Sequence, residues 1–442
     1  MEISLIFLFI ILLTIFILLF FKIDYLIYFF CITCPIVDWF YRIKISIFSG
    51  IDILAISFPC ALLIKFIITK RSSVISEFNK DETIILYYFL LLSLLIGGIF
   101  PLYIGKSYSI KTFYDIITDW AKFSTYFIVL LVFSGYVLNK KSIEKLFLIF
   151  PFSLLLPGAY FFWQLITNQL VRNAGRLIPS CGFVNPHFIT YDVMMILPMV
   201  IFNIYNAKIK SHKIMWTISF LIMLLIAFFS QARTGWFAIV AELFIVVLLL
   251  DSKKNKFLIF SFILLLLSSL YLLGYLDLYI SKLSDISYFF HHINEVWNSQ
   301  DKKIITLFSG RWGIWRADIK AFFHSTWWEL LFGRGIGSAV GIAAAKTGFF
   351  VAEAHNSYIV LLIDFGIINF VLYCCIMVLM FIKAIRFLKS YDPFIKNVGK
   401  SWICLLGGYI VVNIGTHLCY TVVSSWIFWA FCGTCIGLYK KF

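Results

Sequence analysis

The chain has 442 residues, of which 62% are hydrophobic and 13% charged, and its formal net charge is +15. Soluble domains carry roughly 25% charged residues, so this composition excludes an ordinary soluble protein and indicates an integral membrane protein. Fifty Phe, 23 Tyr and 13 Trp suit lipid tails and membrane interfaces.

A membrane-spanning helix needs about 20 mostly apolar residues. Twelve stretches meet this requirement and predict an all-α polytopic membrane protein. The predicted spans are 3–21, 45–68, 84–104, 123–138, 143–167, 188–205, 214–232, 235–250, 257–276, 356–382, 401–418 and 422–438. The chain thus divides into 1–276 with nine helices, a long loop at 277–355 with short helices, and 356–442 with three helices. The apolar stretch 25–37 is short for a span, so we expect it to be re-entrant or interfacial.

Basic residues indicate the orientation of these spans. Cytoplasmic loops of membrane proteins are enriched in Lys and Arg. With a cytoplasmic N-terminus, the cytoplasmic connections carry nineteen basic residues and the short outer loops carry nine. We therefore expect both termini in the cytoplasm and the long loop on the outer face. The positive charge is then explained by topology, and nucleic acid is not an expected partner.

The ten cysteines include two Cys-x-x-Cys pairs, Cys31/Cys34 and Cys432/Cys435. A zinc site needs further Cys or His ligands, and none lies near either pair in sequence. We interpret all four as small hydrophobic side chains in helices, and we predict no metal site.

The first outer element of chemical interest joins spans five and six. It contains Arg172, Arg176 and a turn that ends in Asn185-Pro186-His187. The planar guanidinium of Arg176 suits phosphate oxygens. The alternative is an interfacial loop whose arginines contact lipid headgroups.

The second element is Arg233, which lies between two apolar runs within Ser230-Gln231-Ala232-Arg233-Thr234-Gly235-Trp236. An arginine at membrane depth is costly unless it is paired or faces a wet cavity. It can also extend toward the lipid headgroups. The surrounding polar corner favours a functional arginine.

The long loop is rich in aromatic and basic residues. It contains Asp285, His291, His292 and Glu295, then Gly310-Arg311, Trp315 and the segment Gly333-Arg334-Gly335-Ile336-Gly337. Residues 314–323 have helical spacing, so we expect short helices that lie over the membrane cavity. The glycine-rich segment lacks the strand that a dinucleotide-binding fingerprint requires.

The loop ends at His355-Asn356-Ser357-Tyr358, where the next span begins. Histidine exchanges protons near neutral pH, and a helix N-terminus favours anions such as phosphate. A neutral His355 could accept the proton of an attacking sugar hydroxyl. The alternative is a structural histidine in an interfacial cap.

Together these motifs resemble the O-antigen ligase and O-antigen polymerase superfamily of bacterial envelope glycan enzymes. The matching motifs are Gly175-Arg176 with Gly182-Phe183-x-Asn185-Pro186, Ser230-x-x-Arg233-Thr234-Gly235-Trp236, Gly310-Arg311-x-x-x-Trp315 with Gly333 to Gly337, and His355-Asn356-x9-Gly366. This chain departs from the pattern at Asn369, where Gly, Thr or Tyr is usual. The motif region covers 175–370, which is under half of the chain.

The resemblance implies a GT-C-like fold and an inverting glycosyl transfer without metal, nucleotide or soluble cofactor. The donor would be an undecaprenyl-diphosphate-linked oligosaccharide, and the active site would face the exterior of the bacterial inner membrane. Arg233 and Arg311 would hold the diphosphate, while His355 would assist the acceptor hydroxyl, with Glu353 as its orienting partner. The predicted substrate-binding residues are Arg176, Asn185, Trp315, Arg334, Asn356 and Tyr358.

Three functions fit the resemblance or the hydropathy. The first is a polymerase that joins lipid-linked repeat units and works with membrane lipid and a chain-length regulator. The second is a ligase that uses lipid A-core as acceptor, or an O-linked protein glycosyltransferase. The third is a flippase for lipid-linked oligosaccharide. The in-span charges Asp52, Lys65, Asp192, Glu242 and Asp364 form no repeat between halves, which disfavours a transporter.

Overall fold

The structure is a computed structural model. It describes residues 2–40, 43–45, 48–69, 81–103, 113–137, 139–173, 176–179, 181, 183, 187–230, 232–250, 311–339, 342, 354–418 and 421–441. The predicted span 257–276 and the histidines 291 and 292 lie outside these residues.

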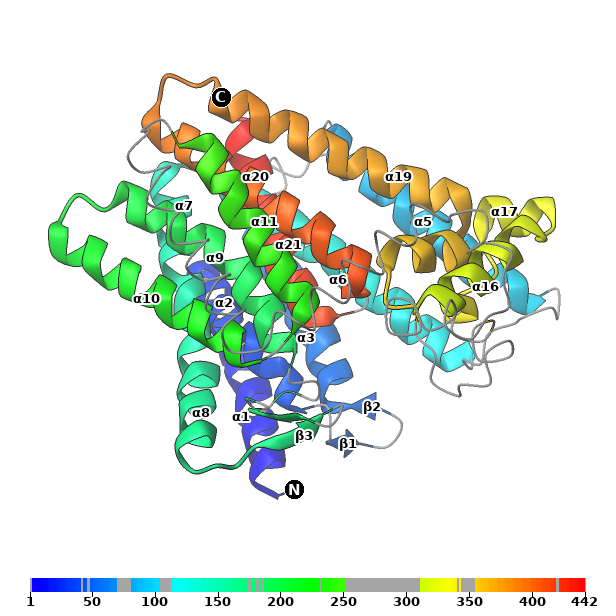
Figure 1. Ribbon diagram of the computed structural model, residues 1–442, viewed down its shortest axis with the longest axis horizontal. Coiled ribbons are helices and arrows are strands. Elements are labelled where there is room, and N and C mark those ends of the chain that lie inside the picture. Colours follow the sequence, from blue (N-terminus) through cyan, green and yellow to red (C-terminus); the bar gives the residue numbers. More distant parts are fainter. Residues whose placement is uncertain are drawn as a thin grey trace.

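The first half of the described chain is helical apart from two short hairpins (Figure 1). Its elements are α1 (Glu2–Leu18), α2 (Ile23–Thr33), η1 (Cys34–Phe40), β1 (Lys44–Ile45), β2 (Phe48–Ser49), α3 (Gly50–Ile68), α5 (Glu82–Tyr103), α6 (Phe113–Tyr136), α7 (Lys140–Ile149), η2 (Phe150–Leu154), α8 (Leu155–Ile166), β3 (Val171–Asn173) and β4 (Arg176–Ile178). Strands β1 and β2 pair antiparallel, as do β3 and β4, with Lys44 opposite Ser49 and Val171 opposite Ile178.

The second half contains the elements that build the candidate site. They are α9 (Phe188–Asn206), α10 (Lys210–Phe229), α11 (Arg233–Leu249), α16 (Arg311–Phe323), α17 (Trp327–Phe332), α19 (Ser357–Leu388), α20 (Pro393–Gly415) and α21 (Val422–Tyr439). Helices α16 and α17 confirm the prediction of short helices in the long loop.

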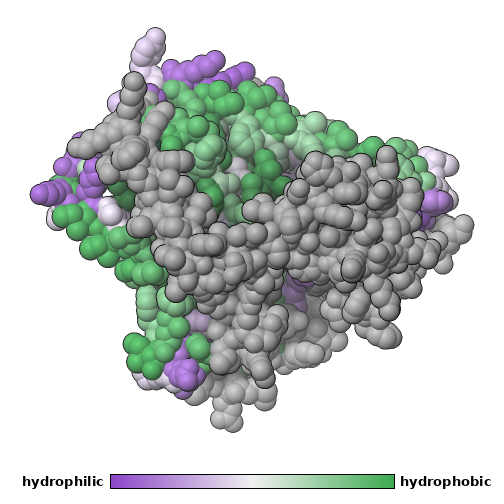
Figure 2. All heavy atoms as spheres, viewed as in Figure 1, coloured by the Kyte–Doolittle hydropathy of each residue, from purple (hydrophilic) through white to green (hydrophobic). Residues whose placement is uncertain are grey.

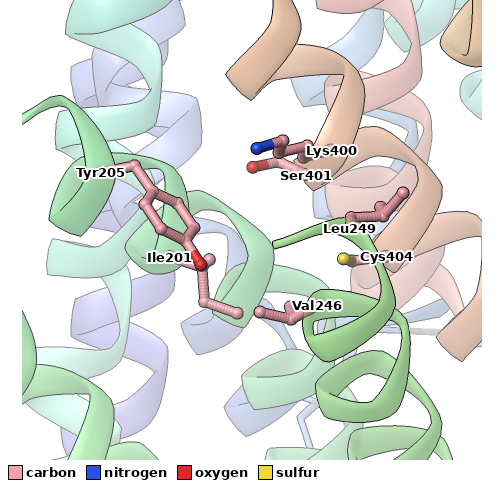
Figure 3. Close-up of a pocket in the computed structure, with 7 residues that line it drawn as sticks. All are labelled: Ile201, Tyr205, Val246, Leu249, Lys400, Ser401 and Cys404. Atoms are coloured by element: carbon pink, nitrogen blue, oxygen red, sulfur yellow. The ribbon is translucent and has the colours of Figure 1, made fainter. Parts of the chain in front are cut away.

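Nine helical stretches within the described residues are long and apolar enough to cross a membrane, and three shorter apolar helices accompany them. This confirms the polytopic all-α fold. Figure 2 shows hydrophobic residues across much of the described surface, with hydrophilic residues gathered toward its edges. Helix α10 is the least covered span, because only 28% of its window is buried.

The stretch Ile23–Phe40 differs from the prediction for 25–37. Helix α2 and η1 together form an 18-residue stretch with enough length and hydropathy to span. Lys65 Nζ donates to the Leu19 carbonyl oxygen (2.6 Å), and Tyr136 Oη donates to Asp24 Oδ1 (2.6 Å). The turn between α1 and α2 therefore lies beside the C-terminal ends of α3 and α6.

This stretch bears on the placement of the N-terminus. Figure 1 shows the N-terminus near the β hairpins, at the opposite end of the bundle from the C-terminus. The prediction that both termini lie in the cytoplasm stays a prediction, and this arrangement favours termini at opposite ends of the bundle. The sequence rule did not predict a span here because the apolar run 25–37 ends before the polar Asp38 of η1.

The core is centred on α21, of which 94% of the spanning window is buried. Tyr409 of α20 stacks on Phe428, with ring centroids 3.7 Å apart. Gly433 lets α21 approach α6 closely, because a Cβ there would lie 2.5 Å from the Leu130 carbonyl oxygen. Cys432 and Cys435 are buried free thiols, as the hydrophobic interpretation predicted.

The glycine-rich segment of the long loop docks on a kink in α19. Gly366 has φ +78°, and a Cβ on it would overlap the main chain of Gly333. The Asp364 carboxylate accepts hydrogen bonds from the main-chain N–H groups of Gly337 (2.8 Å) and Ala339 (2.9 Å). Gly333 to Gly337 therefore connects the short helices to a membrane helix, and the spacing from His355 to Gly366 fixes where they attach.

Candidate functional site

The site is built around the C-terminal end of α20. We call Gly415, Thr416 and His417 the α20 end. Arg311, the first residue of α16, donates from Nη1 to the Gly415 carbonyl oxygen (2.8 Å). The main-chain N–H of Ser357, the first residue of α19, donates to the Thr416 carbonyl oxygen (3.1 Å). Two helix starts are thus held against one helix end.

His355 lies next to this contact and has a constrained backbone. Its φ is +46°, a region that non-glycine residues adopt rarely and that is often found at functional sites. Asn356 caps α19, because its Oδ1 accepts from the N–H groups of Tyr358 (3.0 Å) and Ile359 (3.1 Å). Trp315 Nε1 donates to the Ala354 carbonyl oxygen (2.6 Å). The segment that carries His355 is therefore fixed on both sides.

The Arg233 motif reaches the same place through its neighbours. Arg233 begins α11, although its side chain is outside the described part of the structure. A Cβ on Gly415 would overlap Thr234 Cγ2 and would lie 3.6 Å from Arg311 Nη1. The starts of α11 and α16 therefore meet at the α20 end. The two predicted arginines are brought to one site from positions 78 apart in sequence.

The start of α9 supports the Arg233 corner from the other side. Tyr191 Oη and Thr234 Oγ1 are hydrogen-bonded (3.1 Å), and His187 Nδ1 is 3.0 Å from the Ser230 carbonyl oxygen. A Cβ on Gly235 would lie 2.5 Å from Thr190 Cγ2, so this corner requires glycine. The polar motif residues thus fix the turn from which Arg233 projects.

The electrostatics follow from these helix ends. The N-termini of α11, α16 and α19 meet at the α20 end, and each carries a partial positive charge. Arg311 adds a full positive charge, because its guanidinium stays protonated at any physiological pH. The arrangement favours a negatively charged ligand, and a diphosphate fits this requirement.

Other predicted residues have contacts within the fold. The Arg334 guanidinium is 7% exposed and donates to Ser325 Oγ (2.9 Å) and to the Ala321 carbonyl oxygen (2.9 Å). Tyr358 Oη donates to the Ile410 carbonyl oxygen of α20 (3.1 Å). These bonds join the glycine-rich segment to α16 and to the turn that follows it, and α19 to α20. Asn185 and Glu353 lie outside the described residues.

Arg176 begins β4, in the hairpin that precedes α9, and only its main chain is described. Nearby, the Cys181 N–H donates to Gln164 Oε1 (2.7 Å) and attaches this loop to α8. Burial raises the pKa of the Cys181 thiol, so this cysteine is an inert packing group.

Two residues that position the site were missed from sequence. His417 faces His355, with ring centroids 5.4 Å apart, and Asp364 anchors the glycine-rich segment. The predicted span 401–418 contains His417, and Asp364 enters the sequence pattern only as an in-span charge. A histidine at a helix end on the same face as His355 is the signal that could have identified His417.

The fold and the site define a polytopic membrane protein with basic groups and histidines gathered at helix ends on one side. Residues 218–374 match the family model described as O-antigen ligase, which confirms the predicted resemblance to the O-antigen ligase and polymerase superfamily. The match includes Arg233, Arg311, His355 and Gly366, and it ends before the α20 end. No curated protein matches the chain.

The family match supports a membrane glycan-processing function of the ligase or polymerase type. The family match and the apolar helices together support a multi-pass protein of the bacterial inner membrane.

Proposed function

We propose that this protein is a glycosyltransferase that polymerises glycan repeat units from an undecaprenyl-diphosphate-linked donor. The observation that carries the proposal is the meeting of Arg311, His355 and the start of α11 at the α20 end. This meeting supports the proposal, because a guanidinium can bind a diphosphate and a histidine can accept the proton of a sugar hydroxyl.

The reaction proceeds in one displacement. The acceptor hydroxyl oxygen attacks the anomeric carbon of the donor sugar, and its proton passes to His355. The bond from that carbon to the diphosphate oxygen breaks, and undecaprenyl diphosphate leaves with the bonding electrons. Attack opposite the leaving group inverts the anomeric configuration. Arg311 and Arg233 stabilise the charge that develops on the diphosphate.

These groups supply charge stabilisation without a metal ion. We therefore expect the purified protein to retain activity after a chelator removes divalent cations. Loss of activity that added metal restores would contradict this part of the proposal.

We place the site on the outer face of the membrane. The turn from α19 to α20 and the helix ends beside it, at the far end of both helices from the site, are basic. They carry Arg386, Lys389, Lys396 and Lys400. Cytoplasmic loops carry such excess positive charge. The C-terminus follows α21 on that same side, whereas α1 begins near the site side (Figure 1).

The second candidate is a ligase that transfers finished glycan to lipid A-core, or an O-linked protein glycosyltransferase. These enzymes differ from a polymerase in the acceptor. The polymerase is favoured because the ligase pattern fails at Asn369. In the structure Asn369 is buried, and its Nδ2 donates to the Phe365 carbonyl oxygen (2.7 Å) beside the Gly366 kink.

The test is the polysaccharide profile of a deletion strain. A single repeat unit on the lipid acceptor supports the polymerase, and long unligated polymer supports the ligase. Donor confined to the cytoplasmic leaflet, or an unchanged profile, would contradict both. Complementation of the deletion strain with His324→Ala should restore the wild-type profile. His324 is exposed, and its contact in the described residues is within its own helix, where Nδ1 lies 2.7 Å from the Lys320 carbonyl oxygen.

A further inference from the structure

His417 is the closest histidine neighbour that the described structure gives to His355. The two rings have centroids 5.4 Å apart and planes inclined by 40°. His417 lies in the short connection from α20 to α21, 62 positions after His355 and beyond the residues that match the family model. Both side chains are half-buried, so both are reachable from the site.

The backbone around His417 is held on both sides. Ahead of it, Arg311 binds the Gly415 carbonyl oxygen, and Ser357 binds the Thr416 carbonyl oxygen through N (3.1 Å) and Oγ (3.2 Å). After it, Ser425 Oγ donates to the Leu418 carbonyl oxygen (2.8 Å). These bonds fix the position of the imidazole relative to His355.

The two histidines have opposite helix environments. His417 follows the C-terminus of α20, whose partial negative charge favours an imidazolium. His355 directly precedes Asn356, the N-cap of α19, where the partial positive charge favours a neutral imidazole. Neighbouring titratable groups whose environments favour different charge states take different roles in a reaction.

The other charged or titratable groups near the pair come from each packed element. Helix α16 contributes Arg311, and α11 begins with Arg233. Helix α19 contributes Tyr358, and α9 contributes Tyr191 through its bond to Thr234. The Arg311 guanidinium adds positive charge, which further opposes protonation of both histidines in the resting site.

We propose that His417 is a positioning residue that carries the proton of the histidine pair and thereby keeps His355 neutral. This inference rests on the proposed function, because it concerns the group that accepts the proton of the sugar hydroxyl. His417 remains an imidazolium during the step, and His355 changes from neutral to cationic.

The test is the pH–rate profile of the purified full-length protein with a lipid-linked oligosaccharide donor. His355 must be neutral, so activity falls on the acid side as it becomes protonated. His417→Gln removes the neighbouring cation, so the proton affinity of His355 should rise roughly tenfold. We therefore expect the acid limb of the profile to lie about one pH unit higher. Activity above this limb should approach wild type.

His417→Lys keeps a cation at the position and should return the acid limb toward its wild-type place. His324→Gln removes an exposed histidine and should leave the profile unchanged. If His417→Gln does not accumulate in the membrane, His417→Asn tests the same loss of charge.

The outcomes separate this inference from the proposed function. An unshifted acid limb in His417→Gln or His417→Asn, together with an inactive His355→Ala, overturns only the role of His417. An active His355→Ala overturns the proposed function itself. Equal loss of activity at every pH in both the Gln and the Lys variants would assign His417 a structural role instead.

Discussion

Arg311 Nη1 lies 2.8 Å from the Gly415 carbonyl oxygen, so an arginine of the long loop binds the end of a membrane helix. Only one of its five N–H donors is needed for this bond. The Gly415 bond fixes the position of the guanidinium, whose planar shape suits a diphosphate. Arg311 therefore has both a positioning and a ligand-binding capacity.

Arg311→Lys should lower glycan transfer roughly 10- to 100-fold, because a charge remains but the oriented fork is lost. Arg311→Ala should abolish transfer. Arg316→Lys, one turn further along α16, is the matched control and should retain activity. Transfer is measured with purified protein at saturating donor. Wild-type turnover in Arg311→Lys would show that the fork is not required.

Gly415 lets the start of α11 meet the α20 end. Gly415→Ala should reduce turnover about tenfold or more, because the new Cβ overlaps Thr234 Cγ2 and displaces the turn that carries Arg233. Thr234→Ser removes that methyl group and keeps the hydroxyl that bonds Tyr191. The double variant should recover activity. Failure of Thr234→Ser to rescue Gly415→Ala would show that this contact does not limit the reaction.

The kink in α19 should be important for stability. Gly366→Ala should destabilise the protein by about 1–3 kcal/mol from backbone strain alone, and the overlap with Gly333 adds to this cost. Thermal unfolding in detergent and proteolysis of the long loop report the change. Gly158→Ala is the control, since its Cβ would meet only the flexible Ile226 Cδ1, at 3.3 Å.

The orientation can be tested by cysteine labelling. His324 is exposed beside the short helices, and Tyr391 is fully exposed in the turn between α19 and α20. We expect a membrane-impermeant reagent to label His324→Cys in intact cells and Tyr391→Cys only after permeabilisation. The parent protein corrects for native cysteines. The reverse pattern would place the site in the cytoplasm.

Much of the fold and part of the site could be predicted from sequence. Apolar length identified most helices, and polar residues at their ends identified Arg311 and His355. The crossing at 23–40 was missed because its second part is η1, whose polar Asp38 interrupts the apolar run. Composition cannot show that Asp38 is buried inside the bundle.

The tertiary contacts of the site could not be predicted for a related reason. The α20 end contributes two main-chain carbonyl groups, at Gly415 and Thr416, and carbonyl groups carry no sequence signal. His417 lies beside His355 only because α19 packs against α20. Arg334 illustrates the opposite case, because its motif suggested substrate binding and its guanidinium bonds to α16 and the following turn.

The most direct measurement is single-turnover glycan transfer by purified His355→Ala, with His324→Ala as control and a lipid-linked oligosaccharide as donor. Loss of a general base lowers such a rate about 10²- to 10⁴-fold. We expect a loss in that range for His355→Ala and wild-type transfer for His324→Ala, with both proteins equally abundant and folded. Transfer by His355→Ala at the wild-type rate would contradict the account.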